Sequence, residues 1–136
     1  MLTDRFQSIR PLLLIDSATC VACGLLMTAA ARPMAQLTHI PEALLTYAGL
    51  ALFGVAAFIA LVATRAAESA PAVGAVIAGN LGWCAASSWL LVGGVITPTP
   101  LGQAFIALQA VVVLALALLE ARALGVATSA RQKLAS

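Results

Sequence analysis

Apolar residues fill four long blocks of this 136-residue chain, and short, more polar segments separate them. Each block is close to the roughly 20 residues that an α-helix needs to cross a bilayer. The blocks do not alternate apolar and polar positions, as the strands of a membrane β-barrel would, and they are rich in alanine and leucine. The pattern therefore predicts an all-α membrane protein with four transmembrane helices, over about residues 11–31, 42–64, 72–95 and 101–124.

The six prolines lie at the edges of these blocks, where a residue without an amide hydrogen suits a helix start or a linker. The linkers between the blocks, residues 32–41, 65–71 and 96–100, are short. Short linkers force consecutive helices to pack antiparallel. We therefore expect a single domain, residues 1–136, folded as an up-down-up-down four-helix bundle.

The composition agrees with a membrane environment. Hydrophobic residues make up 62% of the chain and charged residues 9%, too apolar a balance for a small soluble domain. The first block contains Asp16 and is longer than the apolar region of a signal peptide, so we interpret it as a retained helix. A net charge of +2 with no basic patch excludes nucleic acid as a partner.

The basic residues predict the orientation in the membrane, because lysine and arginine accumulate on the cytoplasmic side. Arg32 is the one basic residue expected on the outer side, together with His39 and Glu42. The other six flank the side that holds both termini: Arg5, Arg10, Arg65, Arg122, Arg131 and Lys133. Both termini are therefore expected in the cytoplasm.

Three polar residues fall within the apolar blocks, in the third of the membrane nearest the cytoplasm. Asp16, Asn80 and Glu120 belong to the first, third and fourth blocks. Ionisable groups inside a membrane are costly and commonly mark functional sites. If the bundle turns these side chains inward, they form a polar intramembrane cluster in a vestibule open to the cytoplasm.

Helical spacing supports an inward-facing stripe. Asp16 shares one helix face with Cys20, Cys23 and Met27, and Asn80 shares another with Cys84 and Ser87. Gln109 and Glu120 belong to one stripe of the fourth helix. The secondary candidates for the site are therefore Cys20, Cys23, Cys84, Ser87 and Gln109.

Several roles remain open for the two carboxylates. Asp16 is interpreted as a hydrogen-bonded tie to Asn80 or a neighbouring helix, as a proton- or cation-binding group, or as a side chain exposed at the interface. Glu120 is expected to reach the interface or to pair with Arg65 or Arg10.

The cysteines do not indicate a disulfide framework, because all three lie inside apolar blocks. Cys20 and Cys23 form a C-x-x-C, but in mid-span and not at the helix start that lowers a thiol pKa in redox proteins. Packing is the favoured interpretation, and a soft metal such as Cu(I), held with Cys84 and Met27, is the alternative. The chain has no catalytic set of residues, so we expect no enzyme, no cofactor and no metal.

Small residues recur every fourth position along the third helix. This helix-packing set consists of Gly74, Ala78, Gly82 and Ala86. Such spacing lets helix backbones approach closely in lipid. It predicts close packing within the bundle or, alternatively, a homodimer interface.

Two resemblances add expectations. The run Gly79-Asn80-Leu81-Gly82-Trp83, with Pro98-Thr99-Pro100-Leu101-Gly102, Gln109-Ala110 and Leu119-Glu120, resembles small four-span bacterial inner-membrane proteins of unknown function. That resemblance implies a multi-pass protein of the bacterial inner membrane. The chain length, four spans and acidic residue in the first span are similar to those of small multidrug resistance transporters. In that family a glutamate in the first helix exchanges protons for cationic drugs, which implies this role for Asp16.

The favoured hypothesis is a small non-enzymatic membrane protein, either an accessory or structural subunit or a bundle that binds a hydrophobic ligand. Its partners would be the lipid bilayer and a second copy of itself or a larger membrane complex. The alternative is a proton-coupled exporter of small solutes or cationic drugs that works through Asp16.

Overall fold

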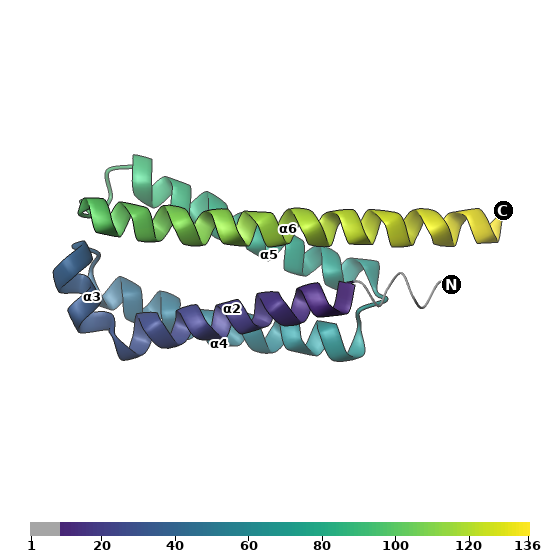
Figure 1. Ribbon diagram of the computed structural model, residues 1–136, viewed down its shortest axis with the longest axis horizontal. Coiled ribbons are helices and arrows are strands. Elements are labelled where there is room, and N and C mark those ends of the chain that lie inside the picture. Colours follow the sequence, from purple (N-terminus) through teal and green to yellow (C-terminus); the bar gives the residue numbers. More distant parts are fainter. Residues whose placement is uncertain (1–8) are drawn as a thin grey trace.

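The computed structural model describes residues 9–136, which form five helices and no strand (Figure 1). The four long helices are α2 (Ile9–Ala29), α4 (Glu42–Arg65), α5 (Ala70–Val92) and α6 (Pro100–Ala135), and the short helix is α3 (Ala31–Thr38). The expected all-helical fold is confirmed for this part of the chain. Arg5, which contributes to the predicted orientation, lies outside the described residues.

Each long helix is long and apolar enough to cross a membrane. Their outer faces carry large apolar side chains, such as Leu108 at 68% exposed and Val111 at 63%. Exposing such surface to water costs about 25 cal/mol per Å², whereas lipid removes this cost. The predicted number of four candidate spans is therefore confirmed.

The linker expected at residues 32–41 is largely helical, because α3 occupies most of it. Pro33 explains why α3 is separate from α2. In a continuous helix its ring would clash with the carbonyl of Ala29, which is where α2 ends, but proline is tolerated in the first turn of a new helix. His39 then ends α3 in the left-handed conformation, with φ of 54°.

The last helix is longer than the apolar block that predicted it. We expected it to end near residue 124, but α6 continues to Ala135. No proline follows Pro100, so nothing in the chain stops the helix where its sequence becomes more polar. Figure 1 shows the end of α6 extending beyond the other helices.

The long helices are arranged as two pairs. α2 packs mainly against α4, and α5 packs mainly against α6, which Figure 1 shows as two layers. Close approach holds the α2/α4 pair together, since a Cβ atom on Gly24 would lie only 2.9 Å from the carbonyl oxygen of Gly49. The buried Ser17 hydroxyl also donates a hydrogen bond to the Ala56 carbonyl, at 2.9 Å.

A junction at the α3 end connects the two pairs. The Thr99 amide donates to the Thr38 carbonyl at 2.9 Å, and the Thr99 hydroxyl donates to the Leu37 carbonyl at 2.9 Å. Gly102, in the first turn of α6, lies against the same Thr38 carbonyl, where a Cβ atom has no room. Thr99 also accepts the Gly102 amide as the N-cap of α6. The pairs are therefore joined at this end by the loop that precedes α6.

Candidate functional site

The second junction between the pairs is a polar cluster of three side chains from three helices. The Asn80 amide nitrogen on α5 donates to Asp16 Oδ2 on α2 at 2.6 Å and to Glu120 Oε2 on α6 at 3.4 Å. Cys20 completes the cluster, its Sγ lying 3.9 Å from Asp16 Oδ1. The structure thus brings together the three residues predicted for the polar intramembrane cluster, and the Asp16–Asn80 tie is present.

The two carboxyl groups of the cluster are enclosed, whereas Asn80 also lines a separate cavity of about 370 Å³ between α4 and α5. Asp16 and Glu120 are both 0% exposed, and Asn80 is 4% exposed. On α4, Thr64 and Arg65 are exposed at the end of the helix and do not join the cluster. A vestibule open to one end of the bundle is therefore not what this structure has.

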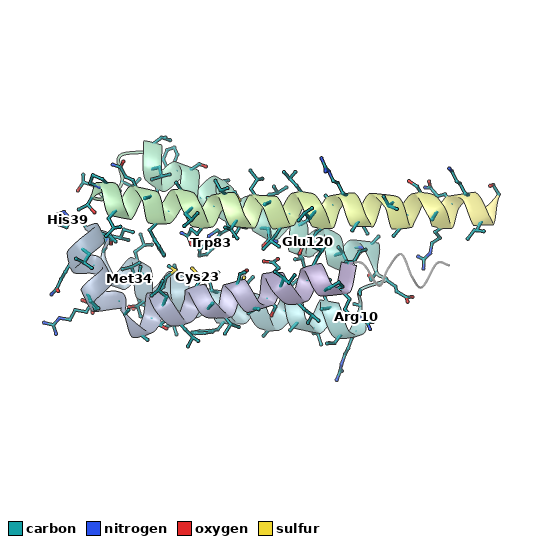
Figure 2. All side chains as sticks on the ribbon, in the orientation of Figure 1. Arg10, Cys23, Met34, His39, Trp83 and Glu120 are labelled. Carbon is teal, nitrogen blue, oxygen red and sulfur yellow. The ribbon has the colours of Figure 1, made fainter. Side chains whose placement is uncertain are left out.

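Glu120 does not reach the interface, in contrast to the prediction. Its side chain points into the space between the two helix pairs, whereas Arg10 lies at the edge of the molecule (Figure 2). Among residues 9–136, Glu120 Oε1 is the one fully enclosed side-chain oxygen or nitrogen without a hydrogen-bond partner. Glu120 therefore pairs with neither Arg10 nor Arg65, and Asn80 is its partner.

The electrostatic consequence is a pair of carboxyl groups that share one amide. No hydrogen bond or ion pair joins Asp16 or Glu120 to a lysine, arginine or histidine within the described chain. Two bare negative charges are costly where lipid and protein exclude water. The cluster therefore has the chemistry to hold a proton or another small cation.

Two further sulfur atoms, those of Cys23 and Met27, follow the cluster along α2 toward α3. Cys23 Sγ is 3.6 Å from Met27 Sδ and 3.5 Å from Gln109 Oε1 on α6. Cys84 Sγ instead donates to the Ala110 carbonyl, within the α5/α6 pair. Residues 9–136 contain no group of three histidine, cysteine, aspartate or glutamate side chains placed to hold a metal ion.

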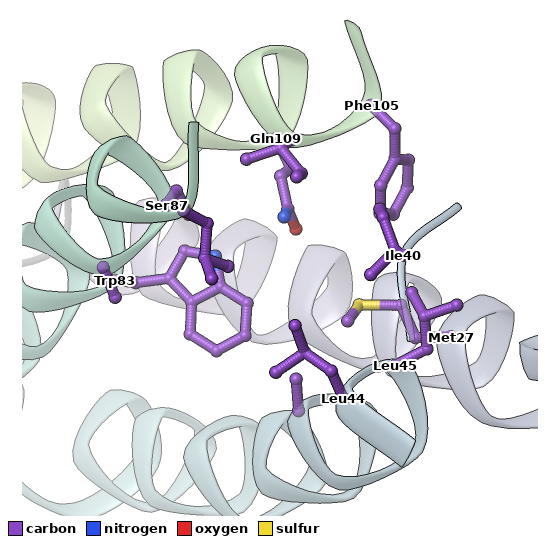
Figure 3. A pocket seen from close by; sticks show the side chains of 12 residues that line it. Met27, Ile40, Leu44, Leu45, Trp83, Ser87, Phe105 and Gln109 are labelled. Atoms are coloured by element: carbon purple, nitrogen blue, oxygen red, sulfur yellow. The ribbon is translucent and has the colours of Figure 1, made fainter. Parts of the chain in front are cut away.

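Two neighbouring cavities lie between the helix pairs, beyond the polar cluster. The central cavity has a volume of about 150 Å³, and all four long helices line it (Figure 3). The side cavity has a volume of about 340 Å³ and extends along α2 and α6 past Cys20 and Cys23. Trp83, Phe105 and Gln109 line both cavities, which makes them adjacent. Their walls are apolar apart from a few side chains, including the predicted Ser87 and Gln109.

The helix-packing set on α5 does not make the closest helix contacts of this chain. A Cβ atom added to Gly74 or Gly82 would meet nothing within 4 Å. Ala86 lines the central cavity. The close glycine approach is between Gly24 and Gly49, on the other pair. As a homodimer surface, the set on α5 remains a prediction.

Sequence reasoning missed three residues that shape this region. Trp83 was not among the candidate site residues, although a large ring among small neighbours on α5 is a signal for a lining position. Phe105 and Ser17 carried no such signal. Figure 2 shows Trp83 and Cys23 facing the space between the two helix pairs.

Comparisons of the chain with protein-family models, with curated proteins and with solved structures find no match.

Proposed function

We propose that this chain is a small non-enzymatic membrane protein that binds a hydrophobic molecule between its two helix pairs. The observation that carries the proposal is the pair of adjacent apolar cavities that share Trp83, Phe105 and Gln109. Ligand sites in proteins are concave, mostly apolar, and commonly lie between the helices of a bundle. A side cavity of about 340 Å³ has the size of such sites.

The proposed setting is the bacterial inner membrane, in an up-down-up-down topology with both termini in the cytoplasm. The distribution of lysine and arginine supports this orientation, because six of the seven flank one side of the predicted bundle. In this orientation α3 lies at the outer end and the polar cluster lies nearer the cytoplasm. A ligand would then reach the cavities from the bilayer.

Binding can be measured through Trp83, which lines both cavities. In a Trp89→Phe background Trp83 is the single tryptophan, and the methyl ester of 9,10-dibromostearic acid quenches tryptophan at short range. Titration of this probe into detergent-solubilised protein is expected to give saturable quenching. A linear, non-saturating response would contradict the proposal.

A cavity-filling variant tests the location. Ala48 lines the central cavity from α4, so Ala48→Phe is expected to weaken binding of the brominated ester at least tenfold. Ala57→Phe is the matched control, since Ala57 is exposed on the same helix and lines neither cavity. Equal binding by the two variants would place the ligand elsewhere.

A proton-coupled exporter is the second candidate, favoured by the buried carboxyl pair that contacts no cationic side chain in the described chain. Such a protein would use Asp16 to exchange a proton for its substrate. Asp16→Asn is then expected to abolish proton-driven efflux of ethidium from membrane vesicles while leaving the fold intact. Glu68→Gln, at an exposed acid outside the helices, is the control. A ligand-binding or accessory protein would give no efflux in either variant or in the wild type.

A further inference from the structure

Three polar side chains that line the central cavity have hydrogen-bond donors without an acceptor. They are the Trp83 indole, the Ser87 hydroxyl and the Gln109 amide. Within residues 9–136 no hydrogen bond from Trp83 Nε1, Ser87 Oγ or Gln109 Nε2 is formed. All three groups come from the α5/α6 pair, whereas the opposite wall of the cavity, formed by the α2/α4 pair, is apolar.

The orientation of the Gln109 amide is fixed by its oxygen. Gln109 Oε1 accepts from Cys23 Sγ at 3.5 Å, which assigns the nitrogen of the same amide to donate elsewhere. Figure 3 shows this amide pointing into the space between the Trp83 ring and Phe105. Its two N–H hydrogens therefore face the cavity and not another helix.

Unpaired donors are costly in this place. An amide or hydroxyl that loses water without gaining a partner destabilises a protein. These three donors border the open space of the cavity, because Glu120 Oε1 is the one fully enclosed side-chain oxygen or nitrogen without a partner in residues 9–136. The surroundings offer no replacement, because the other lining residues, such as Leu44 and Ile106, are apolar. Donors that converge on an apolar space indicate that what fills the space brings the acceptor.

We propose that the bound molecule is a neutral lipophile with a carbonyl-type oxygen, such as an ester, a ketone or a quinone. Its oxygen accepts hydrogen bonds from Gln109, with Ser87 and Trp83 as further donors, and its apolar body occupies the side cavity. The lining of both cavities is uncharged, since it contains no lysine, arginine, histidine, aspartate or glutamate. An uncharged lining favours a neutral ligand over an ion. This inference rests on the proposed function and adds the class of ligand.

The test compares two probes that differ only in the acceptor. In the Trp89→Phe background, saturable quenching of Trp83 is measured with the methyl ester of 9,10-dibromostearic acid and with 9,10-dibromooctadecane. The ester is expected to bind about fivefold more tightly, the value of one net hydrogen bond. Gln109→Leu is expected to remove this preference while the hydrocarbon still binds. Gln103→Leu is the matched control, because Gln103 is exposed on the same helix and donates to the Pro98 carbonyl outside both cavities.

The outcomes separate the inference from the proposed function. Equal affinity of the two probes, or an ester preference that survives Gln109→Leu, overturns the carbonyl acceptor but leaves hydrophobic binding standing. Absence of saturable quenching by both probes overturns the proposed function itself. Loss of binding of both probes in Gln109→Leu, with a native circular dichroism spectrum, would show that Gln109 shapes the cavity and does not select the ligand, which also overturns the inference.

Discussion

Replacing Asn80 with leucine is expected to lower the free energy of unfolding by about 1–3 kcal/mol, because a buried acceptor then loses its donor. Asn80 is the hydrogen-bond donor shared by Asp16 and Glu120, at 2.6 and 3.4 Å. Glu120 Oε1 already lacks a partner within the described chain, so leucine would leave both carboxyl groups without an amide. The measurement is reversible unfolding in mixed micelles, followed by circular dichroism.

A double-mutant cycle distinguishes this electrostatic role from simple packing. If Asn80 stabilises the carboxyl pair, the same Asn80→Leu substitution is expected to cost less in a Glu120→Gln background, where one of the two acidic groups is already removed. Ser88→Leu is the control, since Ser88 is exposed on α5 and bonds only to the Cys84 carbonyl of its own helix. Equal costs of Asn80→Leu in the two backgrounds would mean that Asn80 does not stabilise the carboxyl pair through Glu120, and that its contribution comes from the bond to Asp16 and from packing.

The cluster shows where the sequence pattern is sufficient and where it is not. Asp16 and Asn80 could be matched because both lie a few residues from the same edge of their apolar blocks, on helices expected to run in the same direction. Glu120 was predicted in the same cluster, but the interface role also expected for it was wrong, because the edge of the fourth block was treated as the end of its helix. Since α6 continues to Ala135, Glu120 lies well inside a regular helix, and its side chain is buried against α5.

The cavities could not be predicted, because they depend on how far the two helix pairs separate. Hydrophobic periodicity identifies the apolar face of a helix. Most faces of a membrane-spanning helix are apolar, so periodicity does not show which face contacts lipid and which contacts a neighbouring helix. The separation follows from two junctions instead: the polar cluster at one level, and Thr99 against Leu37 and Thr38 at the other. The second junction depends on α3, in a segment expected to be a linker.

The same difficulty applies to the small residues, since spacing alone does not show which stripe faces another helix. The regular set on α5 was predicted to pack closely, yet the close helix contact uses one glycine from α2 and one from α4. Gly24 and Gly49 lie on separate helices, so no spacing within either helix identifies them as a pair. What they share is a backbone-to-backbone contact that only the assembled α2/α4 pair creates.

This contact leads to the second large effect that we expect. Gly24→Val and Gly49→Val should each destabilise the protein by about 1–3 kcal/mol, because the added side chain overpacks the interface. A Cβ atom at Gly24 would lie 2.9 Å from the Gly49 carbonyl oxygen, and one at Gly49 would lie 3.1 Å from the Gly24 carbonyl oxygen. Backbone atoms cannot move aside as a flexible side chain can, so the helices themselves must separate.

Gly54 provides the matched control on the same helix as Gly49. A Cβ atom there meets nothing within 4 Å, so Gly54→Val is expected to change the free energy of unfolding by less than about 0.5 kcal/mol. Thermal unfolding of the three variants in one detergent gives the comparison. If Gly49→Val were as stable as Gly54→Val, α2 and α4 would not be in close contact. The α2/α4 pair would then not be the rigid wall against which the cavities are formed.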